Sequence, residues 1–180
     1  MPSFTTPGGH RRFLMSVVQA LLPASRARRP ALTTLGASPD HIARAYRRAR
    51  PAPAHGHATW LVNLSDAERS RFRERGTRLV GDLVAYLDAL REDARALLAI
   101  AEAEAKDYGA EAAGVGVSLS DTVEGFLRFR KPFIDQLATL SRRKHLDTRE
   151  ATALLVDAET ALDRLLVALM DGHRAAGARP

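Results

Sequence analysis

Apolar residues recur every three or four positions through most of this 180-residue sequence. Side chains at that spacing lie on one face of an α-helix, whereas a strand would require alternation in twos, which no stretch shows. We therefore expect an all-α fold without strands, with more than half of the chain helical. The four stripes are Phe72, Leu79, Val80, Leu83, Leu87, Leu90; Leu97, Leu98, Ala101, Ala105, Tyr108, Ala112; Leu119, Val123, Phe126, Phe133, Leu137, Leu140; and Ala151, Leu155, Ala158, Leu162, Leu165, Leu169.

Start and stop signals surround these stripes. A serine or aspartate with an acidic residue three positions later can cap the first turn of a helix. Such pairs are Ser65 and Glu68, Ser118 and Asp121, and Asp147 and Glu150. We expect helices over 66–90, 92–113, 118–141 and 147–172. Four helices with short connections predict a four-helix bundle with a single core over residues 60–174, followed by a frayed tail at 175–180.

The composition excludes several classes of protein. The sequence has no cysteine, so it has no disulfide, thiolate metal site or cysteine nucleophile. No apolar run approaches the roughly 18 to 20 residues of a membrane span, and we expect a cytoplasmic protein without membrane contact. The sequence also lacks a phosphate-binding glycine loop, a nucleophile elbow and an HExxH motif. We predict a non-enzyme with no catalytic residues, no cofactor and no metal.

The positive charge is concentrated at the N-terminus. Residues 1–50 contain nine arginines and one acid, a net charge of +8, whereas the whole chain has a net charge of +6. A basic segment joined to a nearly neutral domain suggests a polyanionic partner for the segment, and a solvated basic arm is the alternative. Residues 51–59, PAPAHGHAT, form the expected linker. His55 and His57 within it are too few ligands for a structural zinc site.

The first 22 residues allow two interpretations. Residues 1–9 have no charge and no pattern, and we expect them to be disordered. The arginine pair before an apolar run resembles a twin-arginine or transit signal, but Gln19 and Pro23 interrupt the run. An amphipathic helix from about Arg11 is the better reading. Its apolar face would comprise Phe13, Leu14, Val17, Val18, Leu21 and Leu22.

Residues 26–50 resemble a helix-turn-helix motif. Short helices are expected over 26–35 and 39–48, with Gly36 in a left-handed turn between them. In this reading Ile42 anchors the second helix, and Leu32 departs from the small residue usual at its position. Arginines on the second helix would reach phosphates or guanine edges of double-stranded DNA. These predicted DNA-binding residues are Arg44, Arg47, Arg48 and Arg50.

The predicted third helix contains an unexpected charge. Arg130 falls on its apolar stripe, and Pro132 two residues later frees the carbonyl of Arg128 and is expected to bend the helix. One hypothesis is that Arg130 anchors an anionic ligand or partner in a cleft opened at Pro132. The other is that Arg130 turns outward or pairs inside the bundle, with Glu104 as the expected partner.

The segment YGAEAAGVGVSLSDTVEGFLRFRKPFI, residues 108–134, resembles the helical N-terminal sensor domain of RsbR-type co-antagonist proteins, which also precedes the output regions of some PucR-like regulators. The shared features are the glycine-rich turn, the "SLSD" sequence and the "FLxFR" sequence, and the resemblance extends over about residues 60–172. It implies a globin-related regulatory domain without haem, often dimeric, that couples a signal to an output partner.

Three functional hypotheses follow. In the first, basic N-terminal helices bind DNA while the bundle forms a homodimer or senses a signal. In the second, the chain is a stand-alone interaction or sensor domain that binds a regulatory protein partner and no DNA. In the third, an enzyme or cofactor carrier is hidden in the bundle.

Overall fold

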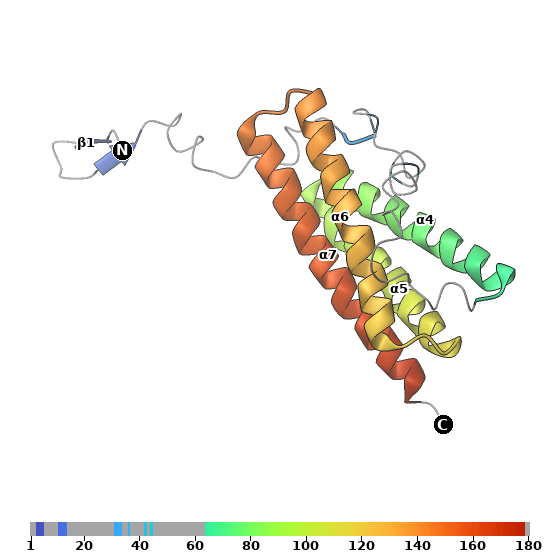
Figure 1. Cartoon of the computed structure of the whole chain (residues 1–180). Helices are drawn as coiled ribbons and strands as arrows, with labels where there is room; N and C mark the ends of the chain where they lie inside the picture. The colour runs from blue at the N-terminus through green and yellow to red at the C-terminus, as the bar shows by residue number, and fades with distance from the viewer. Residues whose placement is uncertain are drawn as a thin grey trace.

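The computed structural model describes residues 3–5, 11–13, 31–33, 36, 42, 44 and 64–178. Four long helices dominate: α4 (Asp66–Asp88), α5 (Arg91–Gly114), α6 (Leu119–Arg143) and α7 (Thr148–Gly177). Two short strands, β1 (Ser3–Thr5) and β2 (Arg11–Phe13), pair antiparallel near the N-terminus (Figure 1). The predicted all-α, four-helix fold is confirmed. Within the described ranges, no helix is long and apolar enough to cross a membrane.

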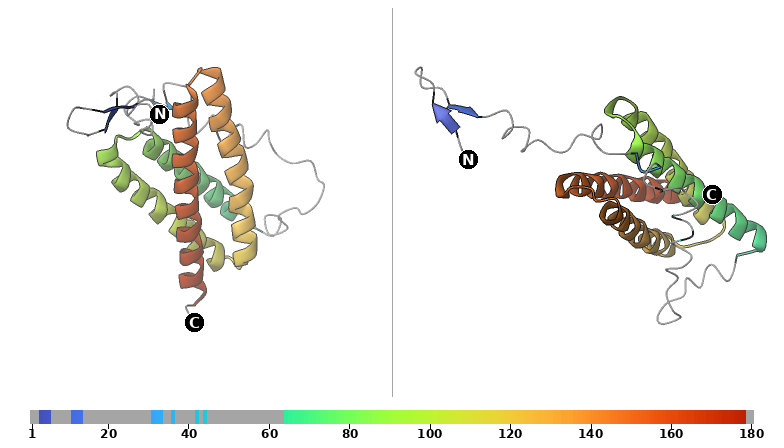
Figure 2. Two further views of the ribbon diagram at one scale, coloured as in Figure 1. Left: turned by 90° about the vertical axis from the view of Figure 1, so that its left-hand side faces the viewer. Right: turned by 90° about the horizontal axis from the view of Figure 1, so that it is seen from above.

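The helices form two layers, α6 with α7 and α4 with α5 (Figures 1 and 2). The most extensive packing joins α5 to α7 across the layers. These two helices run in the same direction, because Glu102 near the middle of α5 pairs with Arg164 of α7 and the later Gly109 lies against Leu169. The sequential pair α6 and α7 is antiparallel, and Arg130 of α6 pairs with Glu159 of α7.

The predicted caps form. Ser65 and Asp147 each make a reciprocal capping box with the glutamate three residues later, and the Ser118 hydroxyl accepts a hydrogen bond from the backbone N–H of Asp121. Such caps satisfy N–H groups that the first helical turn leaves without partners. Because they act over three residues, the caps start the helices within a residue or two of the predicted positions.

The α5–α6 connection depends on Gly116. Its φ of +79° is in the left-handed region that favours glycine. There the N–H of Gly116 donates to Ala113 and that of Val117 to Ala112, which closes α5 with a Schellman motif. Within the described residues, His145 is the non-glycine residue with positive φ, at 54°, and it plays the same part after α6.

Small residues bring α5 and α7 into close contact. A Cβ atom on Gly109 would lie 2.0 Å from the Leu169 carbonyl oxygen, and one on Gly172 would lie 1.9 Å from the Lys106 carbonyl oxygen. Gly172 is therefore a packing position and does not end the helix. The prediction of a frayed tail is wrong up to Gly177, where α7 ends.

The core consists of one large cluster and one small one, rather than the predicted single core. The large cluster includes the fully buried Phe133, Leu83 and Leu165. The small one joins the start of α4 to the α5–α6 turn through Leu64, Phe72, Ala112 and Val117. Leu32 and Ile42 also belong to the large cluster, with exposures of 0% and 2%. The basic N-terminal segment thus has two apolar side chains buried in the bundle.

Several expectations for the N-terminus are wrong. Ser3–Thr5 were expected to be disordered and Arg11–Phe13 to begin a helix, but the two segments pair as β1 and β2. The expectation of a chain without strands fails at these six residues, because ladder hydrogen bonds between two segments are not visible in a local apolar pattern. Residues 31–33, expected to be helical, form part of a turn. Residues 14–30 and the linker at 51–59 lie outside the described residues.

Candidate functional site

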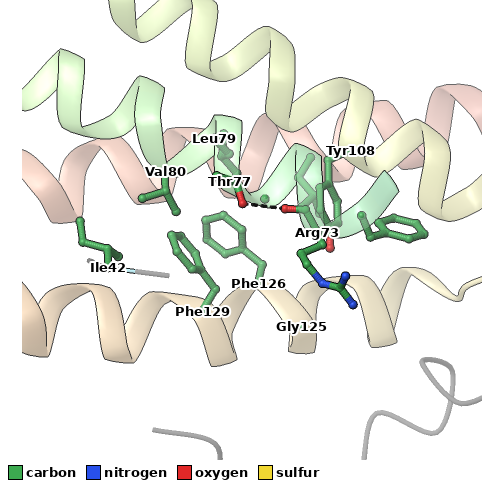
Figure 3. Close-up of a pocket in the computed structure, with 12 residues that line it drawn as sticks. Ile42, Arg73, Thr77, Leu79, Val80, Tyr108, Gly125, Phe126 and Phe129 are labelled. Atoms are coloured by element: carbon green, nitrogen blue, oxygen red, sulfur yellow. Dashed lines mark hydrogen bonds between the residues drawn. The ribbon is translucent and has the colours of Figure 1, made fainter. Parts of the chain in front are cut away.

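A cavity of about 280 Å³ lies between α4 and α6 (Figure 3). Its walls are mainly apolar and aromatic. Phe126 and Phe129 of α6 make an edge-to-face contact with ring centroids 6.1 Å apart, and Phe72 of α4 makes one with Tyr108 of α5 at 5.1 Å. The lining residues are Ile42, Phe72, Arg73, Gly76, Thr77, Leu79, Val80, Tyr108, Gly125, Phe126, Phe129 and Leu169. A concave, mostly apolar site with a few polar groups is typical of small-molecule pockets.

The cavity exists because α4 and α6 are not closely packed. They are absent from the helix pairs with extensive contact, unlike α5 and α7. Gly76 of α4 and Gly125 of α6 both line the space. A Cβ atom on Gly76 would meet nothing within 4 Å, whereas one on Gly109 would meet the backbone of α7. Glycine therefore brings helices together at Gly109, and at Gly76 it adds open space.

Arg73 and Thr77 provide polar groups at the cavity. The Thr77 hydroxyl donates to the Arg73 carbonyl oxygen at 2.9 Å, so the helix itself uses this hydroxyl. The Arg73 side chain is exposed, and in the described part of the chain it makes no ion pair. Figure 3 shows Arg73 extending from α4 toward α6 at one end of the cavity, with Ile42 at the other end. The site thus joins an apolar body to one cationic edge.

Ile42 connects this cavity to the basic segment. Ile42 is buried among residues of the bundle. Leu32, earlier in the same segment, is also buried, and the backbone beside it is bound to the bundle by hydrogen bonds. The Asp88 carboxylate at the end of α4 accepts hydrogen bonds from the backbone N–H of Leu32 and, at 3.2 Å, from that of Thr33. The Thr33 hydroxyl also donates to Asp88 at 3.1 Å. An apolar anchor and an anionic cap therefore both hold the segment against the bundle.

The predicted helix-turn-helix is only partly seen. Gly36 has a φ of +90° and its N–H donates to the Thr33 carbonyl, as expected for the turn glycine. Ile42 is helical and buried, and Arg44 is helical and exposed. The expected helix before Gly36 is absent at residues 31–33. Of the predicted DNA-binding residues, Arg44 is exposed, and Arg47, Arg48 and Arg50 lie outside the described residues.

Glu104 does not pair with Arg130. It faces α4, where it accepts hydrogen bonds from Arg75 at 3.1 Å and Arg78 at 3.2 Å, and its side chain is 17% exposed. Burial raises the pKa of Asp82, and the negative charge of Glu104 raises it further while Arg78 lowers it. Glu104 thus belongs to an ion-pair network between α4 and α5. The prediction of Arg130 as the partner failed because the helical spacing indicates on which face of α5 Glu104 lies, but not which helix packs against that face.

Arg130 pairs across the α6–α7 interface instead. Its guanidinium contacts Glu159 and lies 3.1 Å from Asp163, and its side chain is 30% exposed. The hydrogen bond with Glu159 raises the pKa of Arg130, so the guanidinium remains charged. Helix α6 continues through Pro132, and neither Arg130 nor Pro132 lines the cavity. The α4–α6 cavity lies about two turns earlier, at Gly125, so the hypothesis of an anion-binding cleft at Pro132 stays a prediction.

Stability measurements can test this assignment of ion pairs. We expect Glu104→Gln to lower the free energy of unfolding by about 1.5 to 3 kcal/mol, because it weakens hydrogen bonds from two charged groups at a shielded site. Arg130→Ala should lower it by less than about 1 kcal/mol, because its partners are 40% and 64% exposed. Urea unfolding of the two single variants and of the double variant measures both effects.

The double variant decides whether the two residues interact. Residues in separate networks should give additive changes, within about 0.5 kcal/mol. A coupling energy above about 1 kcal/mol would instead show that Glu104 and Arg130 act on each other, contrary to their separate partners.

Sequence reasoning missed the residues that form the cavity. Arg73, Gly76 and Thr77 lie on α4, for which the sequence analysis considered only the apolar residues that face the core. A usable signal was present, because glycine inside a helix costs about 1 kcal/mol relative to alanine. Gly76 and Gly125 each interrupt a predicted helix, and both line the cavity. The hydrogen bonds from Leu32 and Thr33 to the Asp88 carboxylate had no such signal, since these residues are more than 50 positions away from Asp88 in the sequence.

The described residues include no cluster of three or more histidine, aspartate or glutamate side chains placed to hold a metal ion. The side chains at the cavity are chemically suited to binding, since they comprise aromatic and aliphatic groups, one hydroxyl used by the helix and one guanidinium. Comparison of the chain with known protein families, with curated proteins and with solved structures finds no match.

Proposed function

We propose that this chain is a non-enzymatic, cytoplasmic regulatory protein. Its basic N-terminal segment binds double-stranded DNA, and the helical bundle senses a signal that governs this segment. The observation that supports the proposal is the position of Ile42. This residue belongs to the segment with a net charge of +8, and it is also part of the lining of the α4–α6 cavity.

Regulation would follow from the way the segment is held. Leu32 and Ile42 are buried in the core of the bundle, while Arg44, two residues after Ile42, is exposed. A change in the cavity that displaces Ile42 would therefore move the neighbouring arginines relative to the bundle. A ligand shifts such an equilibrium only by its difference in affinity for the two arrangements. Contact with Ile42 in one arrangement would provide that difference.

Replacing Arg47 and Arg48 by alanine should weaken DNA binding and lower its salt dependence. Each phosphate contact contributes about 0.9 to the slope of log K against log salt concentration, so the slope should fall by about one to two units. Gel shifts with duplex DNA at several salt concentrations measure this. A matched control is the double change Arg142→Ala and Arg143→Ala, which removes two exposed charges at the end of α6 and should leave the slope nearly unchanged.

Two results would count against this proposal. If the wild-type protein does not retard duplex DNA at low salt, the DNA-binding function is wrong. If it binds every duplex with equal affinity, the segment is a basic arm without a recognition helix.

The second candidate is an interaction or sensor domain that binds a regulatory protein and no DNA. It is favoured by large apolar side chains at the surface, since Ile100, Val156 and Val167 are 53%, 57% and 59% exposed. Val156 and Val167 are eleven residues apart on α7, which is three turns, so they lie on one face. A homodimer through this face is part of the same proposal, and sedimentation equilibrium of the full chain tests it.

A further inference from the structure

The α4–α6 cavity has the size and lining of a small-molecule site. An engineered cavity of about 150 Å³ lined by aliphatic and aromatic residues binds benzene. The present cavity, at about 280 Å³, is close to twice that volume. It has room for an apolar body of about two fused rings. The rings of Phe72, Tyr108, Phe126 and Phe129 supply aromatic edges and faces for such a body.

The open space at Gly76 is not required by helix packing. Alanine at this position would favour the helix, and its Cβ atom would meet nothing within 4 Å. Packing does require glycine at Gly109 and Gly172, where α5 and α7 cross, because the absence of a Cβ atom there lets the two backbones come into contact. Gly76 weakens α4 and makes no close contact with another helix, so its effect is to add volume to the cavity. A bound ligand would occupy that volume.

Arg73 indicates the charge of the ligand. The neighbouring arginines of α4 are paired, Arg71 with Glu111 and both Arg75 and Arg78 with Glu104. Arg73 lines the cavity, and no carboxylate in the described ranges pairs with it. A guanidinium binds a carboxylate or phosphate through charge-assisted hydrogen bonds. An anionic group at the Arg73 end would therefore complement the site, with the apolar body directed toward Ile42.

We propose that the α4–α6 cavity binds a small organic anion, with an apolar bicyclic-sized body between α4 and α6 and a carboxylate on Arg73. The role of this anion as the regulatory signal rests on the function proposed above, whereas the binding site stands on its own geometry. Because Ile42 lines the same cavity, bound anion contacts the segment that contains the arginines.

Isothermal titration of the full-length protein with 2-naphthoate tests the site, and uncharged 2-naphthalenemethanol serves as the matched ligand. Gly76→Leu fills the cavity, and Gly114→Leu is its control, because Gly114 also has open space but does not line the cavity. Arg73→Gln removes the charge, and Arg95→Gln is its control, because Arg95 is an exposed arginine on α5 outside the cavity. Thermal melts should show that all four variants remain folded.

We expect saturable binding of 2-naphthoate by the wild type with a Kd below about 1 mM. Gly76→Leu should abolish it, and Arg73→Gln should weaken it about tenfold without changing the affinity for 2-naphthalenemethanol. Both controls should bind like the parent. The site is refuted if the wild type shows no saturable binding, or if Gly76→Leu binds as well as Gly114→Leu. Equal affinity of Arg73→Gln and Arg95→Gln for 2-naphthoate refutes the anionic specificity.

A gel shift with and without 2-naphthoate separates this inference from the proposed function. If both hold, the ligand changes DNA retardation by the wild type and not by Gly76→Leu. If the titration succeeds but no DNA is retarded under any condition, the binding site stands and the DNA-binding function fails. If DNA is retarded but the titration shows no binding, the DNA-binding function stands and the site is refuted.

Discussion

Replacing Gly109 by alanine is expected to lower the free energy of unfolding by about 3 kcal/mol or more. The added Cβ atom would lie 2.0 Å from the carbonyl oxygen of Leu169, well inside van der Waals contact. The contact is with the backbone of α7, so no side-chain rotation relieves it, and α5 and α7 must separate. Since this interface is the most extensive in the bundle, the loss should be large. Urea or thermal unfolding measures it.

Gly76→Ala is the matched control for this prediction. It makes the same chemical change inside a helix, but its Cβ atom would enter open space. It should raise stability by up to about 1 kcal/mol through helix propensity alone. Gly172→Ala should behave like Gly109→Ala, because its Cβ atom would lie 1.9 Å from the Lys106 carbonyl oxygen. If Gly109→Ala and Gly76→Ala gave the same change in stability, the close approach of α5 and α7 would be disproved.

Leu32→Ala should lower the free energy of unfolding by about 2 to 3 kcal/mol. Leu32 is fully buried in the large core cluster, and truncating a buried leucine removes apolar contacts and leaves a cavity. This result is expected only if the basic segment folds together with the bundle as one cooperative unit. Urea unfolding followed by circular dichroism measures the change. Leu90→Ala is the control, because Leu90 is 57% exposed and its truncation should change stability by less than about 0.5 kcal/mol.

The same measurement on residues 54–180 completes the test of domain organisation. A linker at 51–59 predicts that these residues fold without the segment. The burial of Leu32 and Ile42 adds that they should be less stable than the full chain, because the apolar surface under both side chains becomes exposed. If Leu32→Ala unfolds like the parent and residues 54–180 match the full chain, the segment does not pack on the bundle.

Helix positions were largely predictable because their determinants are local. The capping pairs at Ser65, Ser118 and Asp147 lie within three residues of their partners, and each formed as expected. Gly36 has the positive φ expected of the turn glycine for the same reason. Predictions failed where a contact joins distant segments. Examples are the pairing of β1 with β2 and the hydrogen bond from the backbone N–H of Leu32 to the Asp88 carboxylate.

The sequence by itself determined that four helices form, where the three capped helices α4, α6 and α7 begin, and which side of each helix is apolar, because capping and periodicity act within a few residues. Only the tertiary structure decided how the helices are arranged. In this arrangement α5 lies beside α7 and parallel to it. As a result, Glu104 forms ion pairs with arginines of α4, and Arg130 forms an ion pair with Glu159 of α7. The same arrangement left α4 and α6 apart at Gly76 and Gly125 and formed the cavity. Side-chain partners and open space between helices depend on crossing geometry, which no local pattern encodes.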